Sequence, residues 1–214
     1  MSYRLFGRPF AGSLAVEWLL EELSVPYTRV LVTGYRDQVE PAWYAELNPL
    51  CQVPALELDD GRLLTESGAI MLYLADRHSS GDLAPTFDDP ARLPYLRWLS
   101  FLSASVYPAF MQLVHPENAI DDPTQFDAVK KRASVVLATQ WTMLEEALGA
   151  DGHLAGGSLS AADFYLVMFV LWIDDDVEGF MIHHPAIARL ASDLTQRPAV
   201  AAILERHEAG HWSD

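Results

Sequence analysis

Strand-like and helical segments alternate along the first 77 residues of the chain, and this alternation most limits what the chain can fold into. Tyr3 to Gly7 and Pro26 to Val32 have the apolar and β-branched composition of strands, and they flank a helical repeat from Leu14 to Leu23. Ala55 to Leu58 and Arg62 to Leu64 enclose Asp-Asp-Gly, whose Asp-Gly pair favours the tight turn of a hairpin. These residues therefore predict a domain that mixes strands and helices.

A short helix around Pro41 to Leu47 and a longer one that runs from Thr65 to about Arg77 complete the order βαβ–αββα. This is the order of a thioredoxin-like domain. Only helical patterns follow, so the predicted fold class is an α+β thioredoxin-like domain followed by an all-α domain. We expect three parts: the thioredoxin-like domain over residues 1–78, a linker rich in turn-forming residues over 79–90, and the all-helical domain over 91–214.

The charge of the chain limits what it can bind. The formal net charge is −16, and the 14 lysine and arginine residues are spread along the sequence. A phosphate backbone or an anionic membrane surface would be repelled, so neither nucleic acid nor a membrane is an expected partner. Cys51 is the only cysteine, which excludes an intrachain disulfide and fits the reducing cytoplasm. The first residues have the pattern of a strand rather than of a secretion signal, so we expect a cytoplasmic protein.

Two features of the N-terminal half favour the binding of a peptide-like ligand. Pro54 stands at the head of a predicted strand, and if the Val53–Pro54 bond is cis, the Val53 backbone turns toward a cleft where it can pair with an extended peptide. The predicted helix that begins at Glu66 and Ser67 offers free N–H groups to a carboxylate, and Glu66 can accept an ammonium. Each feature alone is more often a strand start or a helix cap, but together they suit a γ-glutamyl peptide.

The segment from Asn48 to Arg77, NPLCQVPALELDDGRLLTESGAIMLYLADR, resembles the glutathione-binding half of glutathione S-transferases. Ala11 to Ala15 is similar to the Ala-Cys-Ser-Leu-Ala of the bacterial beta class, and Gln52 to Leu56 is like its Gln-Val-Pro-Ala-Leu. The helix that carries Tyr107 parallels a helix with a His at that position in the class. The resemblance covers nearly the whole chain and implies the same two-domain fold.

The resemblance also implies contacts for individual residues. Val53, held by cis-Pro54, would pair its backbone with the cysteinyl part of glutathione. Glu66 and Ser67 would bind the γ-glutamyl end. Arg36 falls where the beta class keeps a Lys against the glycyl carboxylate. The remaining contacts would come from Gln52 on the glutathione wall and from four aromatic residues of a second-substrate pocket: Phe10, Tyr107, Phe110 and Trp172.

The sequence departs from the beta class at Gly12, where that class has its reactive Cys. Ser13 is the nearest hydroxyl and is the candidate catalytic residue. Lowering a thiol pKa of about 8.5 by about two units needs about 2.7 kcal/mol of preference for the thiolate. One hydrogen bond to a charged acceptor supplies about 1.5–3 kcal/mol, and a helix N-terminus adds about 0.3–1 kcal/mol. Backbone N–H groups around Gly12 are an alternative donor to the thiolate. In that case Ser13 would only cap the helix.

We therefore expect a glutathione transferase that promotes attack of the glutathione thiolate on a small hydrophobic electrophile. Glutathione would be the co-substrate, no metal is expected, and family analogy implies a homodimer. Two alternatives stay open. The first is a glutathione-dependent disulfide reductase or isomerase on the same scaffold. The second is a non-catalytic binding or regulatory protein, which the missing Cys favours and the retained Val53, Pro54, Glu66 and Ser67 oppose.

The residues His207-Glu208-Ala209-Gly210-His211 match the H-E-x-x-H pattern of zinc metalloproteases. That chemistry needs both histidines on one well-formed helical face and a third ligand elsewhere. Gly210 weakens such a helix, so the pattern predicts no zinc site.

Overall fold

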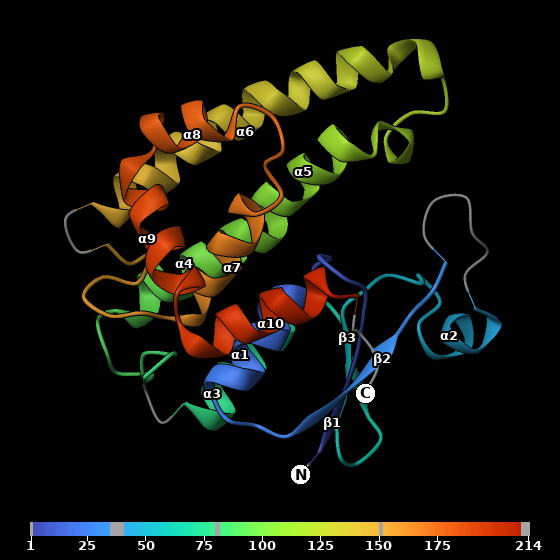
Figure 1. Cartoon of the computed structure of the whole chain (residues 1–214), viewed down its shortest axis with the longest axis vertical. Helices are drawn as coiled ribbons and strands as arrows, with labels where there is room; N and C mark the ends of the chain where they lie inside the picture. Colours follow the sequence, from blue (N-terminus) through green and yellow to red (C-terminus); the bar gives the residue numbers. More distant parts are fainter. Residues whose placement is uncertain (1, 35–40, 80–81, 150–151, 211–214) are drawn as a thin grey trace. The chain divides into compact units, whose positions relative to one another are not determined.

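The computed structural model describes residues 2–34, 41–79, 82–149 and 152–210 (Figure 1). The chain divides into two compact units, Met1–Ala84 with Asp193–Asp214, and Pro85–Ser192. The C-terminal residues from Asp193 onward therefore group with the N-terminal unit. The sequence-based limits of the two domains and their linker stay a prediction.

The first unit is built on a four-stranded mixed sheet with the strand order β2-β1-β3-β4. The strand β1 (Tyr3–Gly7) pairs in parallel with β2 (Tyr27–Leu31) and antiparallel with β3 (Ala55–Glu57), which in turn pairs antiparallel with β4 (Leu63–Leu64). The turn between β3 and β4 contains Gly61 at φ +82°, a conformation that glycine adopts without a steric penalty. The predicted thioredoxin-like order of strands and helices is confirmed.

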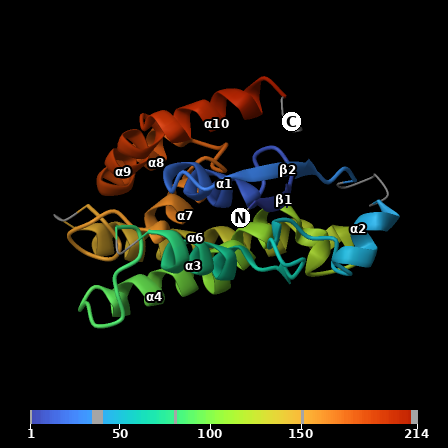
Figure 2. The same cartoon turned by 90° about the horizontal axis from the view of Figure 1, so that it is seen from below.

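Four helices accompany the sheet: α1 (Ser13–Glu22), α2 (Ala42–Leu47), α3 (Ser67–His78) and α10 (Pro198–Glu208). The helix α1 contacts β1, α3 and α10, and Figure 2 shows it between α10 and α3. Every residue of α1 from Ser13 to Leu20 is buried, as expected for a helix that is covered on several faces. One of these buried residues is the acidic Glu17, which therefore needs partners inside the protein.

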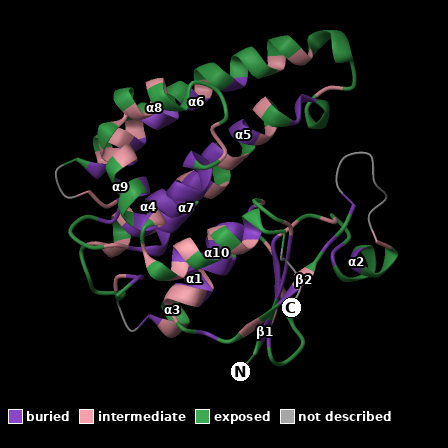
Figure 3. Ribbon diagram, viewed as in Figure 1, coloured by how far each residue is buried: buried purple, intermediate pink, exposed green. Residues whose placement is uncertain are grey.

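The second unit contains helices and no strand among its described residues, as the sequence predicts. Its α7 (Ala161–Val170) is buried at every position and carries the buried colour along its length in Figure 3. At the start of α7 the Asp163 carboxylate accepts hydrogen bonds from the Ser160 N–H and hydroxyl at 2.7 and 2.9 Å and from the Leu154 N–H at 2.8 Å. A capping box therefore begins this central helix.

Of the other helical segments, α4 and the turn that follows it contact α7. The helices α4 and α5 are joined by a π-helical turn at Leu102–Val106. No helix among the described residues is both long and apolar enough to cross a membrane. The bounds of the remaining helices are α4 (Arg92–Phe101), α5 (Tyr107–Val114), α6 (Phe126–Leu148), α8 (Val177–His183) and α9 (Pro185–Thr195).

Candidate functional site

The loop before β3 places the Val53 backbone. The Val53–Pro54 bond is cis, and Pro54 is buried while Val53 is half-buried. The preceding carbonyl, that of Gln52, accepts a hydrogen bond from the Tyr44 hydroxyl at 2.7 Å and another from the Asn48 side-chain amide at 2.9 Å. In a trans peptide the N–H points away from the carbonyl of the same peptide unit. The Val53 N–H is therefore directed away from the anchor that Tyr44 and Asn48 form.

The sheet register brings the first turn of α3 beside this loop. In the antiparallel pair β3–β4, Leu56 lies opposite Leu64. Continuing this register by two residues places Pro54 level with Glu66, which directly precedes α3. On the other side of β3, Ala55 lies opposite Phe6, so the end of β1 and the loop that follows it are also adjacent to Pro54. Three segments that are distant in sequence thus meet at one end of the sheet.

Glu66 has an unusual backbone conformation at the start of α3. Its φ is +66° and its ψ is 107°, and its side chain is exposed, whereas Ser67, the first residue of the helix, is buried. A non-glycine residue in this region costs about 1–3 kcal/mol, and such residues cluster at active sites and ligand clamps. The geometry therefore supports a binding role for Glu66 rather than a purely structural one.

The loop between β1 and α1 is closed by Ser13. The Ser13 hydroxyl donates to the Arg8 carbonyl at 3.1 Å and accepts from the Arg8 N–H at 3.3 Å, and the residue is fully buried. A hydroxyl has a single hydrogen, and Ser13 donates its hydrogen to the Arg8 carbonyl. Gly12 is the N-cap of α1 and supplies no side-chain cap. The catalytic role of Ser13 stays a prediction, and in this geometry the hydroxyl already has a structural use.

The structure brings three of the four predicted pocket aromatics together in the second unit. The Tyr107 ring lies edge-on to the Trp172 ring at a centroid distance of 5.4 Å, and the Phe110 ring lies 5.9 Å from that of Trp172. Phe169, which the helical spacing of these aromatics groups with them, contacts all three rings. Phe10 belongs to the first unit. Whether these residues line a substrate pocket stays a prediction.

Two further predicted residues need separate mention. Arg36 lies outside the described residues, so its predicted contact with the glycyl carboxylate stays a prediction. The Gln52 side chain is exposed, and its backbone carbonyl is the group that the structure fixes. Sequence reasoning missed Tyr44 and Asn48. The signal available was their spacing of four residues at the end of a short helix, just before the Val-Pro pair.

A metal site is not part of this geometry. Within the ranges that the structure describes, no three His, Cys, Asp or Glu side chains gather in a way that could hold a metal ion. His207 of the H-E-x-x-H pattern instead lies buried with its Nε2 2.9 Å from Glu17 Oε2, and His211 lies outside the described residues.

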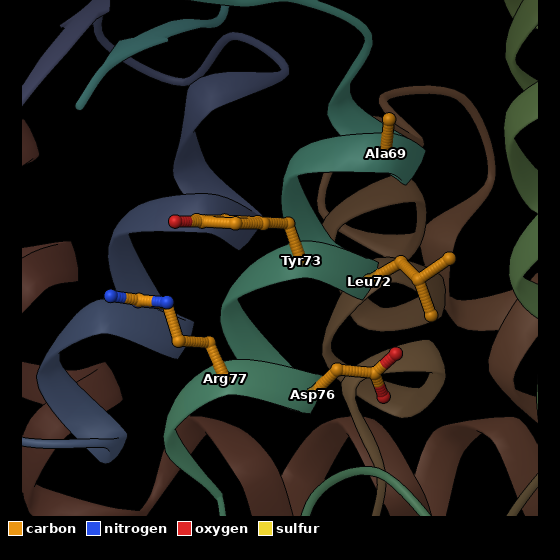
Figure 4. Close-up of a pocket in the computed structure, with 5 residues that line it drawn as sticks. All are labelled: Ala69, Leu72, Tyr73, Asp76 and Arg77. Atoms are coloured by element: carbon orange, nitrogen blue, oxygen red, sulfur yellow. The ribbon is translucent and has the colours of Figure 1, made fainter. Parts of the chain in front are cut away.

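A shallow, open hollow of the first unit lies along α3. It has a volume of about 540 Å³ and is lined by residues of this one helix. Figure 4 shows the Tyr73 and Arg77 side chains extending to one side of α3, and Leu72 and Asp76 to the other. The lining combines apolar surface with one acidic and one basic group, as is common in protein interfaces.

Comparison with known proteins identifies the family. The family model for the glutathione S-transferase N-terminal domain matches residues 12–77, and that for the C-terminal domain matches residues 102–198. Glutathione S-transferase GstA of Escherichia coli O157:H7 is 32% identical over 205 residues, which are 94% of this chain and 96% of the relative.

Solved structures agree with this match. A sphingomonad glutathione S-transferase complexed with glutathione has a TM-score of 0.79 and 32% identity, covering 96% of this chain and 98% of the other. The beta-class enzyme of Sphingomonas chungbukensis has a TM-score of 0.77 and 30% identity, covering 95% and 98%. The geometry agrees with these matches, because the cis-Pro54 loop lies at one end of a thioredoxin-like sheet, beside the first turn of α3 and the β1–α1 loop. The chain belongs to the glutathione S-transferase family.

Proposed function

We propose that the protein is a glutathione transferase that binds glutathione in its first unit and directs the glutathione thiolate at a small hydrophobic electrophile. The observation that carries this proposal is the meeting of the Val53–Pro54 loop, the Glu66–Ser67 helix start and the β1–α1 loop at one end of the sheet. The related sphingomonad transferase, whose structure contains glutathione, supports it. The cytoplasm is the proposed location, because its reducing conditions keep glutathione and Cys51 as thiols.

The binding contacts follow from the geometry of the peptide. Val53, whose N–H is directed away from the Tyr44 anchor, pairs its backbone with the cysteinyl residue as a strand would. The γ-glutamyl carboxylate receives N–H groups and the Ser67 hydroxyl at the start of α3, and the Glu66 carboxylate accepts the ammonium. Arg36 and Gln52 complete the proposed site on the glycyl side, by resemblance to the beta class.

The reaction needs a thiolate. The thiol loses its proton to water, the sulfur attacks the electrophilic carbon, and a carbon–sulfur bond forms as the leaving group departs with its electron pair. The N-terminal end of α1, with Gly12 as N-cap, favours the negative sulfur. Ser13 and the backbone N–H groups beside Gly12 are the two candidates for the hydrogen bond to it.

Calorimetry with glutathione tests the proposal as a whole. We expect heat of binding at glutathione concentrations up to the millimolar range, and formation of a thioether from an aryl halide. Release of a thiol from a glutathionylated disulfide, without thioether formation, would instead support the reductase. Absence of any heat of binding would instead favour a non-catalytic binding or regulatory protein, because a protein that has lost this pocket has no site for glutathione.

Replacing Ser13 with alanine separates the two candidate donors. Because the Ser13 hydrogen lies on the Arg8 carbonyl, we expect the thiol pKa of bound glutathione to stay the same while the free energy of unfolding falls by about 1–3 kcal/mol through the unpaired Arg8 groups. The thiolate absorbance of the complex as a function of pH gives the pKa. A rise of about one unit or more, with the hydrogen-exchange rate of the Phe10 amide unchanged, would make Ser13 the catalytic donor, since one unit corresponds to about 1.4 kcal/mol.

A homodimer through the hollow on α3 is part of the proposal. A two-fold axis at this surface would bring Asp76 of one copy toward the Arg77 of the other, and Leu72 would lie between them. We expect a sedimentation mass of two 23.8 kDa chains and a shift toward one chain in Leu72→Glu. The matched control is Val135→Glu, an exposed apolar position on α6 outside the hollow. An equal mass for both variants would place the interface elsewhere.

A further inference from the structure

His207 of α10 is a buried histidine whose two ring nitrogens both have defined partners. Its Nδ1 lies 3.2 Å from the backbone nitrogen of Phe10, and its Nε2 lies 2.9 Å from the Oε2 atom of Glu17. A backbone N–H can only donate, so Nδ1 is the acceptor and Nε2 carries the hydrogen that Glu17 accepts. The two contacts therefore fix one tautomer of the ring and join α10 to the β1–α1 loop and to α1.

Phe10 is held in a conformation that its residue type disfavours. Its φ is +52°, in the left-handed region, where a bulky side chain is a steric outlier. Such a residue persists only where the surrounding structure holds it, and it is most often found at functional sites. His207 provides two such contacts: the hydrogen bond from the Phe10 N–H, and a ring that meets the Phe10 ring edge-on at a centroid distance of 5.3 Å.

Glu17 is itself held in place by several partners. Its carboxylate is fully buried and lies 3.4 Å from Arg206 Nη1 and 3.7 Å from Arg29 Nε. The Tyr27 hydroxyl lies 3.1 Å from Glu17 Oε1 and 3.0 Å from Glu21 Oε1, so the two carboxylates share its one hydrogen. A carboxylate held by two cations and a hydroxyl has little freedom to turn, so it presents a fixed oxygen to the Nε2–H group of His207.

The loop is thus held at two points. Ser13 fastens its start by bonding both backbone groups of Arg8, and His207 fastens Phe10, two residues before the N-cap Gly12. The Ser13 bonds reach Arg8 at the far end of the loop, whereas the His207 contact holds Phe10 on the stretch that leads into α1 and so keeps the first N–H groups of the helix in one direction.

We propose that His207 is a positioning residue, which acts through the Phe10 N–H to aim the N-terminal end of α1 at the sulfur of bound glutathione. The inference rests on the proposed function. It does not make His207 a catalytic residue, because the ring contacts Phe10 and Glu17 and acts on the sulfur only through the loop. It also gives the first histidine of the H-E-x-x-H pattern a role that involves no metal.

The experiment compares His207→Phe, which keeps a ring but loses both hydrogen bonds, with two other variants. His207→Gln is the conservative variant, because its amide offers an acceptor oxygen and a donor nitrogen, as the neutral histidine ring offers one acceptor and one donor nitrogen. Ile203→Ala is the control: Ile203 is fully buried one turn earlier on α10, so its loss weakens the packing of the same helix. If His207→Phe does not fold, His207→Leu takes its place.

We expect His207→Phe to raise the hydrogen-exchange rate of the Phe10 amide by about 10-fold and the thiol pKa of bound glutathione by about one unit. The affinity for glutathione should change by less than about 3-fold, since the proposed peptide contacts lie elsewhere and a factor of ten needs about 1.4 kcal/mol. His207→Gln should return both the Phe10 exchange rate and the thiol pKa most of the way to their values in the native protein. Ile203→Ala should lower the melting temperature and leave Phe10 exchange and the thiol pKa unchanged.

The outcomes are distinct. Equal Phe10 exchange and equal thiol pKa in His207→Phe and Ile203→Ala would overturn the inference and reduce His207 to a packing residue, with glutathione binding by the native protein still in place. Absence of glutathione binding by the native protein would overturn the proposed function, and the role toward sulfur with it. Faster Phe10 exchange without a change in thiol pKa would show that His207 holds the loop but does not aim it, which also overturns the inference.

Discussion

Replacing Glu17 with leucine is expected to lower the free energy of unfolding by about 3–5 kcal/mol, the cost of breaking a buried ion pair by removing one partner. The Arg29 side chain is only 4% exposed and would lose the Glu17 carboxylate that lies 3.7 Å from its Nε. The Tyr27 hydroxyl and the His207 Nε2–H would also lose an acceptor. Urea unfolding followed by circular dichroism measures the change.

Glu22 offers a matched control for Glu17 on the same helix. It pairs with Arg197, whose side chain is 41% exposed, so water can replace the lost partner. Glu22→Leu is expected to cost about 0–1 kcal/mol. The double variant Glu17→Leu with Arg29→Leu should regain part of the lost stability, because the buried cation that Glu17 served is replaced with an apolar side chain. A similar fall in the free energy of unfolding for Glu17→Leu and Glu22→Leu would mean that burial of the carboxylate does not determine the cost of its removal.

Replacing Glu66 with alanine is expected to weaken glutathione binding by about 10- to 100-fold, which corresponds to the loss of one hydrogen-bonded charged contact. The reason is that the γ-glutamyl ammonium would lose its only proposed carboxylate partner. Calorimetric titration with glutathione measures the effect. Glu57→Ala is the control, since it removes the same charge from the pair that Glu57 forms with Arg4 on the surface of the sheet.

A glycine at the same position separates binding from stability. Glu66→Gly should weaken glutathione binding as much as Glu66→Ala does, yet it should be more stable than the alanine variant by about 1 kcal/mol, because glycine accepts a φ of +66° without a clash. Unchanged affinity in both variants would exclude Glu66 from the site and would direct attention to Ser67.

The parts of this fold that could be predicted are those that depend on neighbours in sequence. Asp-Gly predicted the β3–β4 hairpin, and Val-Pro at the head of a strand predicted where the binding loop would lie. In each case the residues that make the structure are within a few positions of one another. The backbone rules for Gly and Pro then act locally, without information from the rest of the chain.

The parts that could not be predicted depend on residues far apart in sequence. Glu17 and His207 are separated by 190 positions, and neither residue signals the other. The conformation of Phe10 has no local sign, since a phenylalanine is not expected at positive φ. Ser13 could be placed at the start of α1 from the sequence, but the commitment of its hydroxyl to Arg8 depends on the path of the intervening loop.

The grouping of α10 with the first unit has a consequence for the order of synthesis. A ribosome delivers the N-terminal domain of a protein first, and domains usually fold as they emerge. Here the helix that covers α1 is encoded more than a hundred residues after the rest of its unit. Until α10 is made, Glu17 lacks its contacts with Arg206 and His207. The unit that is translated first is therefore completed last.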